Sequence, residues 1–361
     1  MTPLARYQQD LLKPGFAADA AQQHAVEHLE RLYHELVSKA QNPTSLLGKW
    51  FSRQPRACRG LYFWGGVGRG KTYLMDVFFE SLPFPEKMRL HFHRFMRRVH
   101  QELRSLKDQK DPLDEVANRL AAETHVICFD EFFVSDIADA MILGNLMQKL
   151  FDRGVTLLAT SNIIPDRLYE NGLQRERFLP AIAVLKAHVE VVNVDGGTDY
   201  RLRTLEQAPL YYFPLDACAE QEMAASFHRL SDGHALQNPH LEIEGRTITA
   251  RKVANNIAWF DFATLCDGPR SQNDYIELAR EYHTVLLSNV PLLHAGIDDQ
   301  VRRFINLVDE FYDRHVKLII SAQRSPDTLY SGGKLSFEFQ RTQSRLMEMQ
   351  SHEYLARAHR P

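Results

Sequence analysis

The stretch with the clearest chemical pattern runs from Leu61 to Asp76, where several glycines precede a Lys-Thr pair. A glycine, four residues and then Gly-Lys-Thr match the phosphate-binding loop, in which backbone N–H groups surround a phosphate. Lys71 is expected to bridge the β- and γ-phosphates of a nucleotide, and Thr72 to hold Mg²⁺. The predicted nucleotide-binding residues are Gly65, Gly66, Val67, Gly68, Arg69, Gly70, Lys71 and Thr72. An apolar run before this loop and a helix-forming run after it supply the strand and helix that it requires.

A second chemical pattern is the apolar run 126–129 that ends in Asp130 and Glu131. In a parallel sheet, ligand-binding residues lie at the carboxyl ends of the strands. We therefore expect Asp130 to hold Mg²⁺ through water, and Glu131 to polarise the water that attacks the γ-phosphate. Two acids at the end of a strand are common, so this inference depends on their position one helix and one strand beyond the glycine-rich loop.

Polar and basic residues that could complete the site follow the next apolar run, 155–160. Asn162 could hydrogen-bond the γ-phosphate or the attacking water, and a simple Ser-Asn turn is the alternative. Further on, either Arg175 or Arg177 could enter the site of a neighbouring subunit and stabilise transition-state charge, with Arg177 slightly preferred. A surface ion pair is the alternative for each arginine. The pattern favours a homo-oligomer whose sites are completed in trans.

Length and composition are those of an ordinary globular protein with more than one module. The chain has 361 residues, of which 44% are hydrophobic and 25% charged, and its net charge of −3 argues against a generic nucleic-acid binder. No run approaches the roughly 18 apolar residues of a membrane span, and the first residues show no signal or transit pattern, so we expect a cytoplasmic protein. The four cysteines lie far apart and indicate neither a zinc site nor a disulfide framework.

Apolar periodicity predicts the order of the elements. Residues 1–18 are expected to form a polar arm, residues 42–59 a polar linker, and the segment between them a helix with Asp19 as its N-cap. Strands are expected at 61–64, 88–93, 126–130, 155–160 and 188–194, the last closing the core. A helix at 216–230, a hairpin within 241–249 and a strand at 257–262 follow.

This order predicts an α/β protein: a P-loop NTPase core of the AAA+ type with a parallel sheet, followed by a mixed α/β region with a small β-hairpin. The expected domains are an N-terminal arm and helix (1–59), the ATPase core (60–205) and a C-terminal lid or accessory region (206–361). A lid can supply a second phosphate-sensing arginine, and four residues are candidates: Arg302, Arg303, Arg341 and Arg345.

The run 92–106 predicts an amphipathic helix with a basic face, made up of Arg94, Arg97, Arg98, Gln101 and Arg104. A solvated face is the simpler interpretation. The functional alternatives are a surface for an acidic partner, for a neighbouring subunit's nucleotide or for nucleic acid. Three histidines, His91, His93 and His100, have no carboxylate or cysteine in register, so they do not predict a metal site.

Part of the chain is echoed with a constant offset of 161 residues. The segment from Asp152-Arg153-x-Val155 to Leu168-Tyr169 recurs from Asp313-Arg314-x-Val316 to Leu329-Tyr330. The second copy has no glycine-rich loop and no Asp-Glu pair. Either the C-terminal part contains helix–strand units like those of the ATPase core without its chemistry, or helix–strand units with Pro-Asp turns simply look alike.

Several longer motifs together resemble the ZapE and AFG1-like family of AAA+ ATPases. They are Met1-Thr-Pro-Leu-Ala-Arg-Tyr, Gly65-Gly-Val-Gly-Arg-Gly-Lys-Thr, His91-Phe-His-Arg-Phe-Met, Phe129-Asp-Glu-Phe, Thr160-Ser-Asn, Arg177-Phe-Leu-Pro-Ala-Ile, His283-Thr-Val and Arg341-Thr-x-Ser-Arg-Leu-x-Glu-Met. The resemblance spans nearly the whole chain. It implies ATP hydrolysis and, for bacterial members, action on the tubulin-like protein FtsZ in cell division; mitochondrial relatives are linked to turnover of respiratory-chain subunits.

These observations predict an ATPase that uses ATP and Mg²⁺ to remodel a protein partner, FtsZ or another protein substrate. Because no transit peptide is evident, we expect the bacterial kind, recruited from the cytoplasm to the division site. A nucleic-acid-remodelling ATPase of the helicase-loader kind is the alternative, since it shares the same core and could use the basic face 94–104. A third hypothesis is a nucleotide-gated scaffold with very slow hydrolysis.

Overall fold

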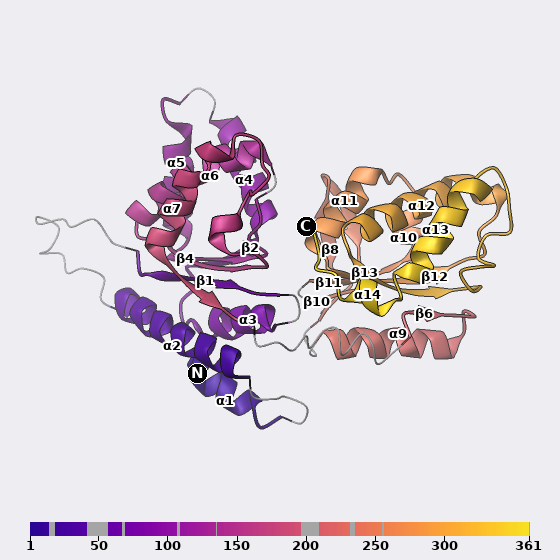
Figure 1. The fold of residues 1–361 in the computed structure, drawn as a ribbon, viewed down its shortest axis with the longest axis horizontal. Helices are drawn as coiled ribbons and strands as arrows, with labels where there is room; N and C mark the ends of the chain where they lie inside the picture. The colour runs from indigo at the N-terminus through magenta and orange to yellow at the C-terminus, as the bar shows by residue number, and fades with distance from the viewer. Residues whose placement is uncertain are drawn as a thin grey trace, which may run out of the picture. The chain divides into compact units, whose positions relative to one another are not determined.

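The computed structural model describes residues 1–13, 19–41, 57–66, 69–106, 109–134, 136–195, 209–231, 235–254 and 256–360. The chain divides into two units, Met1–Thr198 and Asp199–Pro361. Each unit is built around its own sheet, with helices on both faces of that sheet (Figure 1).

The sheet of the first unit contains five parallel strands in the order β2-β3-β4-β1-β5. Their bounds are β1 (Gly60–Trp64), β2 (Lys87–His91), β3 (Val126–Asp130), β4 (Thr156–Ser161) and β5 (Val189–Asn193). Because every pair is parallel, all carboxyl ends lie at one edge. The predicted parallel core is confirmed, and β5 closes it beside β1.

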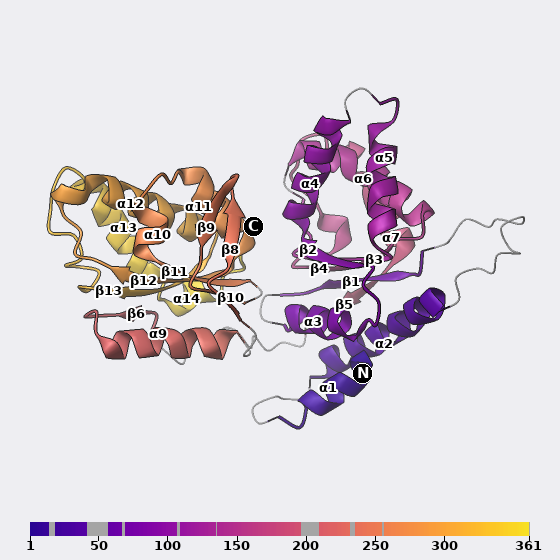
Figure 2. The ribbon, with the colours of Figure 1, turned by 180° about the vertical axis from the view of Figure 1, so that it is seen from behind.

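Helices cover both faces of this sheet (Figures 1 and 2). One face carries α1 (Pro3–Asp10), α2 (Ala20–Gln41) and α3 (Lys71–Ser81), and the other carries α4 (Phe92–Ser105), α5 (Pro112–Glu123), α6 (Ile137–Asp152) and α7 (Leu179–His188). Successive side chains of β3 point to opposite faces of the sheet, so the strand contributes to both hydrophobic cores. Val126 and Cys128 pack in the core with α2 and α3, whereas Ile127 and Phe129 pack in the core on the opposite face. Asp130 follows in the register of Cys128 and therefore faces α3.

The N-terminal segment differs from the predicted polar arm. Pro3–Asp10 form helix α1, with Thr2 as its N-cap, and Tyr7 is buried in the core shared with α2 and α3. A polar composition hid this helix because it buries only a narrow face. The N-cap of α2 is confirmed, since Asp19 Oδ1 accepts the N–H of Ala21 at 2.8 Å. Residues 42–56 of the predicted linker lie outside the described residues.

The strand predicted at 88–93 is also shorter than expected. Strand β2 ends at His91 and α4 begins at Phe92, so His93 lies on a helix. The apolar spacing that predicted the amphipathic helix already begins at Phe92, and Phe92, Phe95 and Val99 are buried against the sheet. Helical packing therefore takes over from the strand two residues before the predicted end.

The sheet of the second unit contains six strands in the order β6-β13-β12-β11-β10-β7. They are β6 (Tyr211–Tyr212), β7 (Leu236–Gln237), β10 (Lys252–Ala254), β11 (Ile257–Asp261), β12 (Thr284–Val290) and β13 (Lys317–Ala322). The first four in this order are parallel, and β10 and β7 are antiparallel additions. The predicted hairpin is confirmed as β8 (His240–Ile243) and β9 (Arg246–Thr249).

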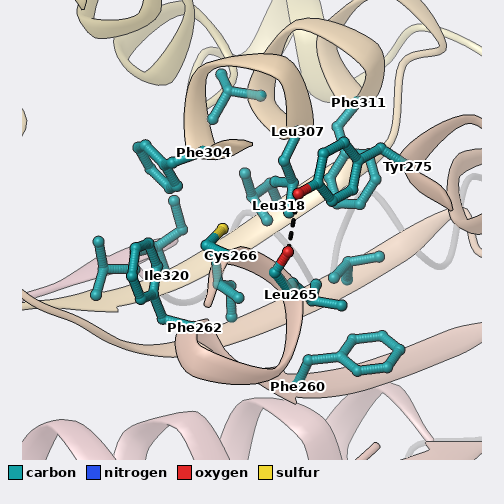
Figure 3. Close-up of a cluster of buried hydrophobic side chains, with 14 of the residues drawn as sticks. Phe260, Phe262, Leu265, Cys266, Tyr275, Phe304, Leu307, Phe311, Leu318 and Ile320 are labelled. Atoms are coloured by element: carbon teal, nitrogen blue, oxygen red, sulfur yellow. Dashed lines mark hydrogen bonds between the residues drawn. The ribbon is translucent and has the colours of Figure 1, made fainter. Parts of the chain in front are cut away.

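Helix α9 (Ala217–Leu230) covers one face of this second sheet (Figures 1 and 2). The other face carries α10 (Phe262–Cys266), α11 (Gln272–Glu281), α12 (Asp298–Asp313) and α13 (Ser336–Glu348). The short helix α14 (His352–Leu355) follows, and its Leu355 packs in the core on the α9 side. Figure 3 shows the core under α12, where Phe304 and Phe311 meet Leu318 and Ile320 of β13. The second unit thus has a sizeable core of its own.

The internal echo is also present in the structure. Helix α6 and strand β4 have the bounds of α12 and β13 shifted by 161 residues. The turns before the two strands also match, since Gly154 and His315 both have a positive φ, of 82° and 56°. In the parallel order, β2-β3-β4-β1 of the first unit corresponds to β11-β12-β13-β6 of the second. The similarity therefore reflects repeated helix–strand units and not only similar Pro-Asp turns.

Candidate nucleotide-binding site

The glycine-rich segment connects β1 to α3, as predicted. Lys71 is the first residue of α3, and its Nζ donates to the carbonyl oxygens of Gly65 at 2.7 Å and Gly66 at 2.6 Å. The ammonium group therefore lies against the backbone of the loop, where a bound phosphate would meet it. Val67 and Gly68 lie outside the described residues.

Gly70, the N-cap of α3, is required by both conformation and space. Its φ of 76° is left-handed, and a Cβ there would lie 2.5 Å from Nε2 of Gln22. A glycine also brings no side chain to cap the first N–H groups of α3, which suits an anion at this helix end.

Two residues that the sequence did not indicate contact the loop. Asp195 follows β5, and its Oδ1 pairs with Arg69 Nε at 2.8 Å while its Oδ2 accepts the N–H of Gly66 at 3.4 Å. Gln22 of α2 donates to the carbonyl of Arg69 at 3.5 Å. Both partners are distant in sequence and reach the loop only because β5 and α2 lie beside β1 and α3.

Asp130 lies at the end of β3, buried, and forms an ion pair that the sequence did not indicate. Arg89 of β2 donates from Nε to Asp130 Oδ2 at 2.7 Å and from Nη2 to Oδ1 at 3.4 Å, and it also pairs with Asp76 of α3. Asp76 follows Thr72 by four residues, so both lie on one face of α3. The helix face that carries Thr72 is therefore directed toward the end of β3.

Burial and charge oppose one another in this group. Burial raises the pKa of Asp76 above that of an ordinary carboxyl group, although Arg89 acts to lower it. Burial lowers the pKa of Arg89, but the charges of Asp130 and Asp76 raise it by more, so the net shift is upward. Arg89 therefore stays protonated, and two carboxylates share one permanent cation.

Glu131 has left-handed backbone geometry, with a φ of 51°. Such geometry is uncommon for a residue other than glycine and is concentrated at functional sites. The N–H of Glu131 donates to Oγ1 of Thr160 at 3.3 Å, and the hydroxyl of Ser161 donates to the carbonyl of Phe132 at 2.8 Å. Two hydroxyls of β4 thus hold the backbone that follows β3. Sequence reasoning missed them, although a Thr-Ser pair at a strand end was visible.

The remaining predicted residues follow β4. Asn162 comes directly after the strand and is exposed. Arg175 and Arg177 lie in a 3₁₀ turn, η3 (Arg175–Arg177), ahead of α7 rather than on a regular helix. Arg175 Nη2 donates to the carbonyl of Asp166 at 2.6 Å, whereas Arg177 is exposed and its side chain forms no ion pair or hydrogen bond with the described part of the chain.

All four candidates for a second sensing arginine have contacts inside the second unit: Arg302, Arg303, Arg341 and Arg345. Arg302 pairs with Glu338 at 3.1 Å, and the last two both pair with Asp309. Each guanidinium therefore has a local partner, and these contacts do not distinguish the four.

The basic face of α4 is partly neutralised, because Arg98 pairs with both Glu102 and Glu123. Across the described ranges, no group of three or more His, Cys, Asp or Glu side chains is arranged to hold a metal ion. None of the helices in those ranges is long and apolar enough to cross a membrane.

A parallel sheet with a glycine-rich loop between β1 and α3, and an acidic residue at the end of β3, defines a P-loop nucleoside triphosphatase of the α/β class.

The chain belongs to the family of AFG1-like ATPases, whose model matches residues 1–358. It is 51% identical over 369 residues to the cell division protein ZapE of Escherichia coli K12, covering 99% of this chain and 98% of that protein. It is 38% identical over 349 residues to lactation elevated protein 1 homolog B of Danio rerio, covering 84% and 69%. The protein is therefore an ATPase, and ATP is its nucleotide.

Among solved structures, the DnaC helicase loader is similar with a TM-score of 0.34 and 14% identity, covering 52% of this chain and 98% of that one. A likeness of this extent carries no inference about function.

Proposed function

We propose that this ATPase uses ATP hydrolysis to remodel a protein partner in bacterial cell division, with FtsZ as the expected substrate at the division site. The support for cell division is the 51% identity, over nearly the full length of both chains, to a protein named cell division protein ZapE. The observation that carries the hydrolytic mechanism is the ion-pair group in which Arg89 joins Asp130 of β3 to Asp76 of the P-loop helix.

The proposed roles follow from this arrangement. Lys71 and the loop N–H groups bind the phosphates, Thr72 and Asp130 hold Mg²⁺, and Glu131 polarises water, while Asn162 contacts the γ-phosphate. Hydroxyl and carboxylate oxygens are the ligands that Mg²⁺ prefers, and the faces of α3 and β3 that bear them point toward one another. When bound, the metal neutralises charge on the phosphates.

Arg177 is the arginine that we propose to act in a neighbouring subunit. Its side chain is exposed and has no hydrogen-bond or ion-pair partner among the described residues, whereas the side chain of Arg175 is already bound to the carbonyl of Asp166. An exposed guanidinium can enter another subunit's site without breaking an existing bond. The active form would then be a homo-oligomer.

Mixing two inactive variants tests the trans arrangement. Arg177→Ala should lower kcat by roughly 10³-fold, and Lys71→Ala should bind no nucleotide. In mixed oligomers, the Lys71→Ala subunit still supplies Arg177 to an intact neighbouring site, so the mixture should regain activity. Arg175→Ala is the matched control and should keep most of its activity. An inactive mixture in which both variants are shown to co-assemble would reject the trans role.

Hydrolysis rates with different additives test the partner. FtsZ should stimulate turnover, whereas single-stranded DNA should not. If DNA stimulates turnover, and the effect falls steeply with salt, a nucleic-acid-remodelling ATPase is favoured instead. Glu131→Gln is the control, because residual turnover in that variant measures contaminating ATPase. A wild-type rate no higher than this control, with or without FtsZ, would favour a nucleotide-gated scaffold.

A further inference from the structure

Arg89, Asp76 and Asp130 form a compact group, the Arg89 group, beneath the P-loop helix. Their side chains are 17%, 24% and 9% exposed. Arg89 comes from β2, Asp130 from β3 and Asp76 from α3, so three elements meet at one guanidinium. Removing Arg89 should cost more than removing one partner of a surface ion pair. Without Arg89, the carboxylates of Asp76 and Asp130 face each other with no cation to compensate their charge.

The contacts to Asp130 are unequal. Its Oδ2 accepts a 2.7 Å hydrogen bond from Nε, whereas Oδ1 is 3.4 Å from Nη2. One carboxylate oxygen is therefore firmly bound, and the other retains acceptor capacity. A carboxylate held in this way has a fixed orientation, as ligands of metal sites do when an outer partner binds their second oxygen.

The second unit, which has no glycine-rich loop, shows which residues occupy the positions of Arg89 and Asp130 there. In the register of the sheets, Arg89 on β2 corresponds to Trp259 on β11, and Asp130 corresponds to Ser288 on β12. Trp259 Nε1 donates to Ser288 Oγ at 2.8 Å, so the same cross-strand bond is made by a neutral pair. Joining these strands therefore does not require charge, and the charged pair in the first unit calls for another explanation.

We propose that Arg89 is a positioning residue for Mg²⁺: it fixes Asp130 so that Oδ1 remains available to the metal or its water, and through Asp76 it aligns the face of α3 that bears Thr72. This inference rests on the proposed role of Asp130 as a metal ligand. In this role Arg89 acts through Asp130 and Asp76, the two carboxyl groups that it contacts. Its planar fork is required because a lysine could not bind Asp130 and Asp76 in fixed directions at the same time.

The test compares the affinity for a non-hydrolysable ATP analogue, measured by calorimetry with Mg²⁺ and with EDTA. Arg89→Ala should leave the metal-free affinity nearly unchanged, because Lys71 and the loop are intact. It should reduce the gain in affinity that Mg²⁺ provides by about tenfold, the usual effect of losing an outer partner of a metal ligand. Arg89→Lys should lose most of the same gain although it keeps the charge. The Mg²⁺ concentration for half-maximal hydrolysis should rise in parallel.

Arg153→Ala is the matched control. Arg153 also forms a partly buried ion pair, with Asp114 at 2.7 Å, but it joins α5 and α6 away from the Arg89 group. This variant should show the wild-type response to Mg²⁺. Equal losses of affinity with and without Mg²⁺ in Arg89→Ala would show a merely structural role and overturn the inference. Should Arg89→Ala fail to fold, Arg89→Lys and Asp76→Asn decide by the same comparison.

Asp130→Ala separates this inference from the proposed function. If Asp130→Ala reduces the Mg²⁺-dependent gain while Arg89→Lys does not, Asp130 remains a metal ligand and the role of Arg89 is rejected. If Asp130→Ala has no effect on that gain, the proposed metal site itself is wrong. In that case the inference about Arg89 fails with it.

Discussion

The carboxyl edges of the two sheets use the same framework for different side chains. In the first unit, Arg89 and Asp130 join β2 to β3 by a charged pair; in the second, Trp259 and Ser288 join β11 to β12 by a neutral hydrogen bond. In each unit, the helix packed beside this pair adds a side chain of the matching kind. Helix α3 adds Asp76 to the charged pair, whereas α9 packs the ring of Phe227 5.8 Å from that of Trp259.

The backbone near the carboxyl ends of β3 and β12 is also repeated. Glu131 and Asn289 both have a left-handed φ, of 51° and 64°. The N–H of Glu131 donates to Thr160 at 3.3 Å, and the N–H of Asn289 donates to Ser321 at 3.1 Å. The left-handed residue and the hydroxyl that binds its N–H are therefore common to both units. The acidic side chain at position 131 is specific to the first unit, which carries the candidate site.

A few side chains therefore distinguish the edge that carries the candidate site from the corresponding edge of the second sheet. The connection between β6 and α9 has only Phe213-Pro214-Leu215-Asp216, without a glycine, where the first unit has its phosphate-binding loop. The fold alone does not imply function, and the site must be argued from its own residues.

The largest expected effect concerns the loop that only the first unit has. Lys71→Ala should abolish ATP binding, because it removes the ammonium group that lies against the loop carbonyls of Gly65 and Gly66. Glu131→Gln should bind ATP normally but lose about 10²–10⁴-fold in kcat. Binding is measured by calorimetry and turnover by phosphate release. Equal loss of binding in both variants, or ATP binding by Lys71→Ala, would contradict the roles proposed for Lys71 and Glu131.

A carboxylate placed at the neutral edge sharpens the contrast. Ser288 is fully buried beside Trp259. Ser288→Asp should lower the free energy of unfolding of the second unit by about 3 kcal/mol, because a neutral Trp259 stands at the position that Arg89 has in the first unit. The control Ser288→Ala should cost about 1 kcal/mol, the loss of one hydrogen bond. Urea denaturation followed by circular dichroism measures both; equal costs would mean that charge is tolerated at this position.

The smallest expected effect concerns the turns that precede β4 and β13. Gly154→Ala should cost about 1 kcal/mol, because an alanine is strained at the left-handed φ of 82°. The counterpart His315 has a side chain at such a position, and its Nδ1 lies 2.7 Å from the carbonyl oxygen of Ala358, so a tertiary hydrogen bond accompanies this geometry. The shift in the unfolding midpoint measures the effect. Unchanged or increased stability would show that the two turns are not equivalent.

Much of the first unit follows from local patterns. Short stretches of sequence are enough to predict the strands β1 and β3, the helix after Asp19 and the loop before Lys71. The reason is that apolar periodicity and glycine spacing are local properties of the chain. The helix α1 was missed because its apolar face is narrow. Arg89, Gln22 and Asp195 were missed because their partners lie far away in the sequence.

Residue types and their spacing identify the residues that could do chemistry, namely the loop at 65–72 and the acids at 130–131. They also show that the echoed segment lacks both. The contacts that hold these residues in place become visible in the folded protein. Strand order places Asp195 beside the loop and Arg89 beside Asp130, and no local pattern encodes that order. The physical reason is that chemistry depends on residue type, which the chain shows directly, whereas orientation depends on contacts between elements that meet only after folding.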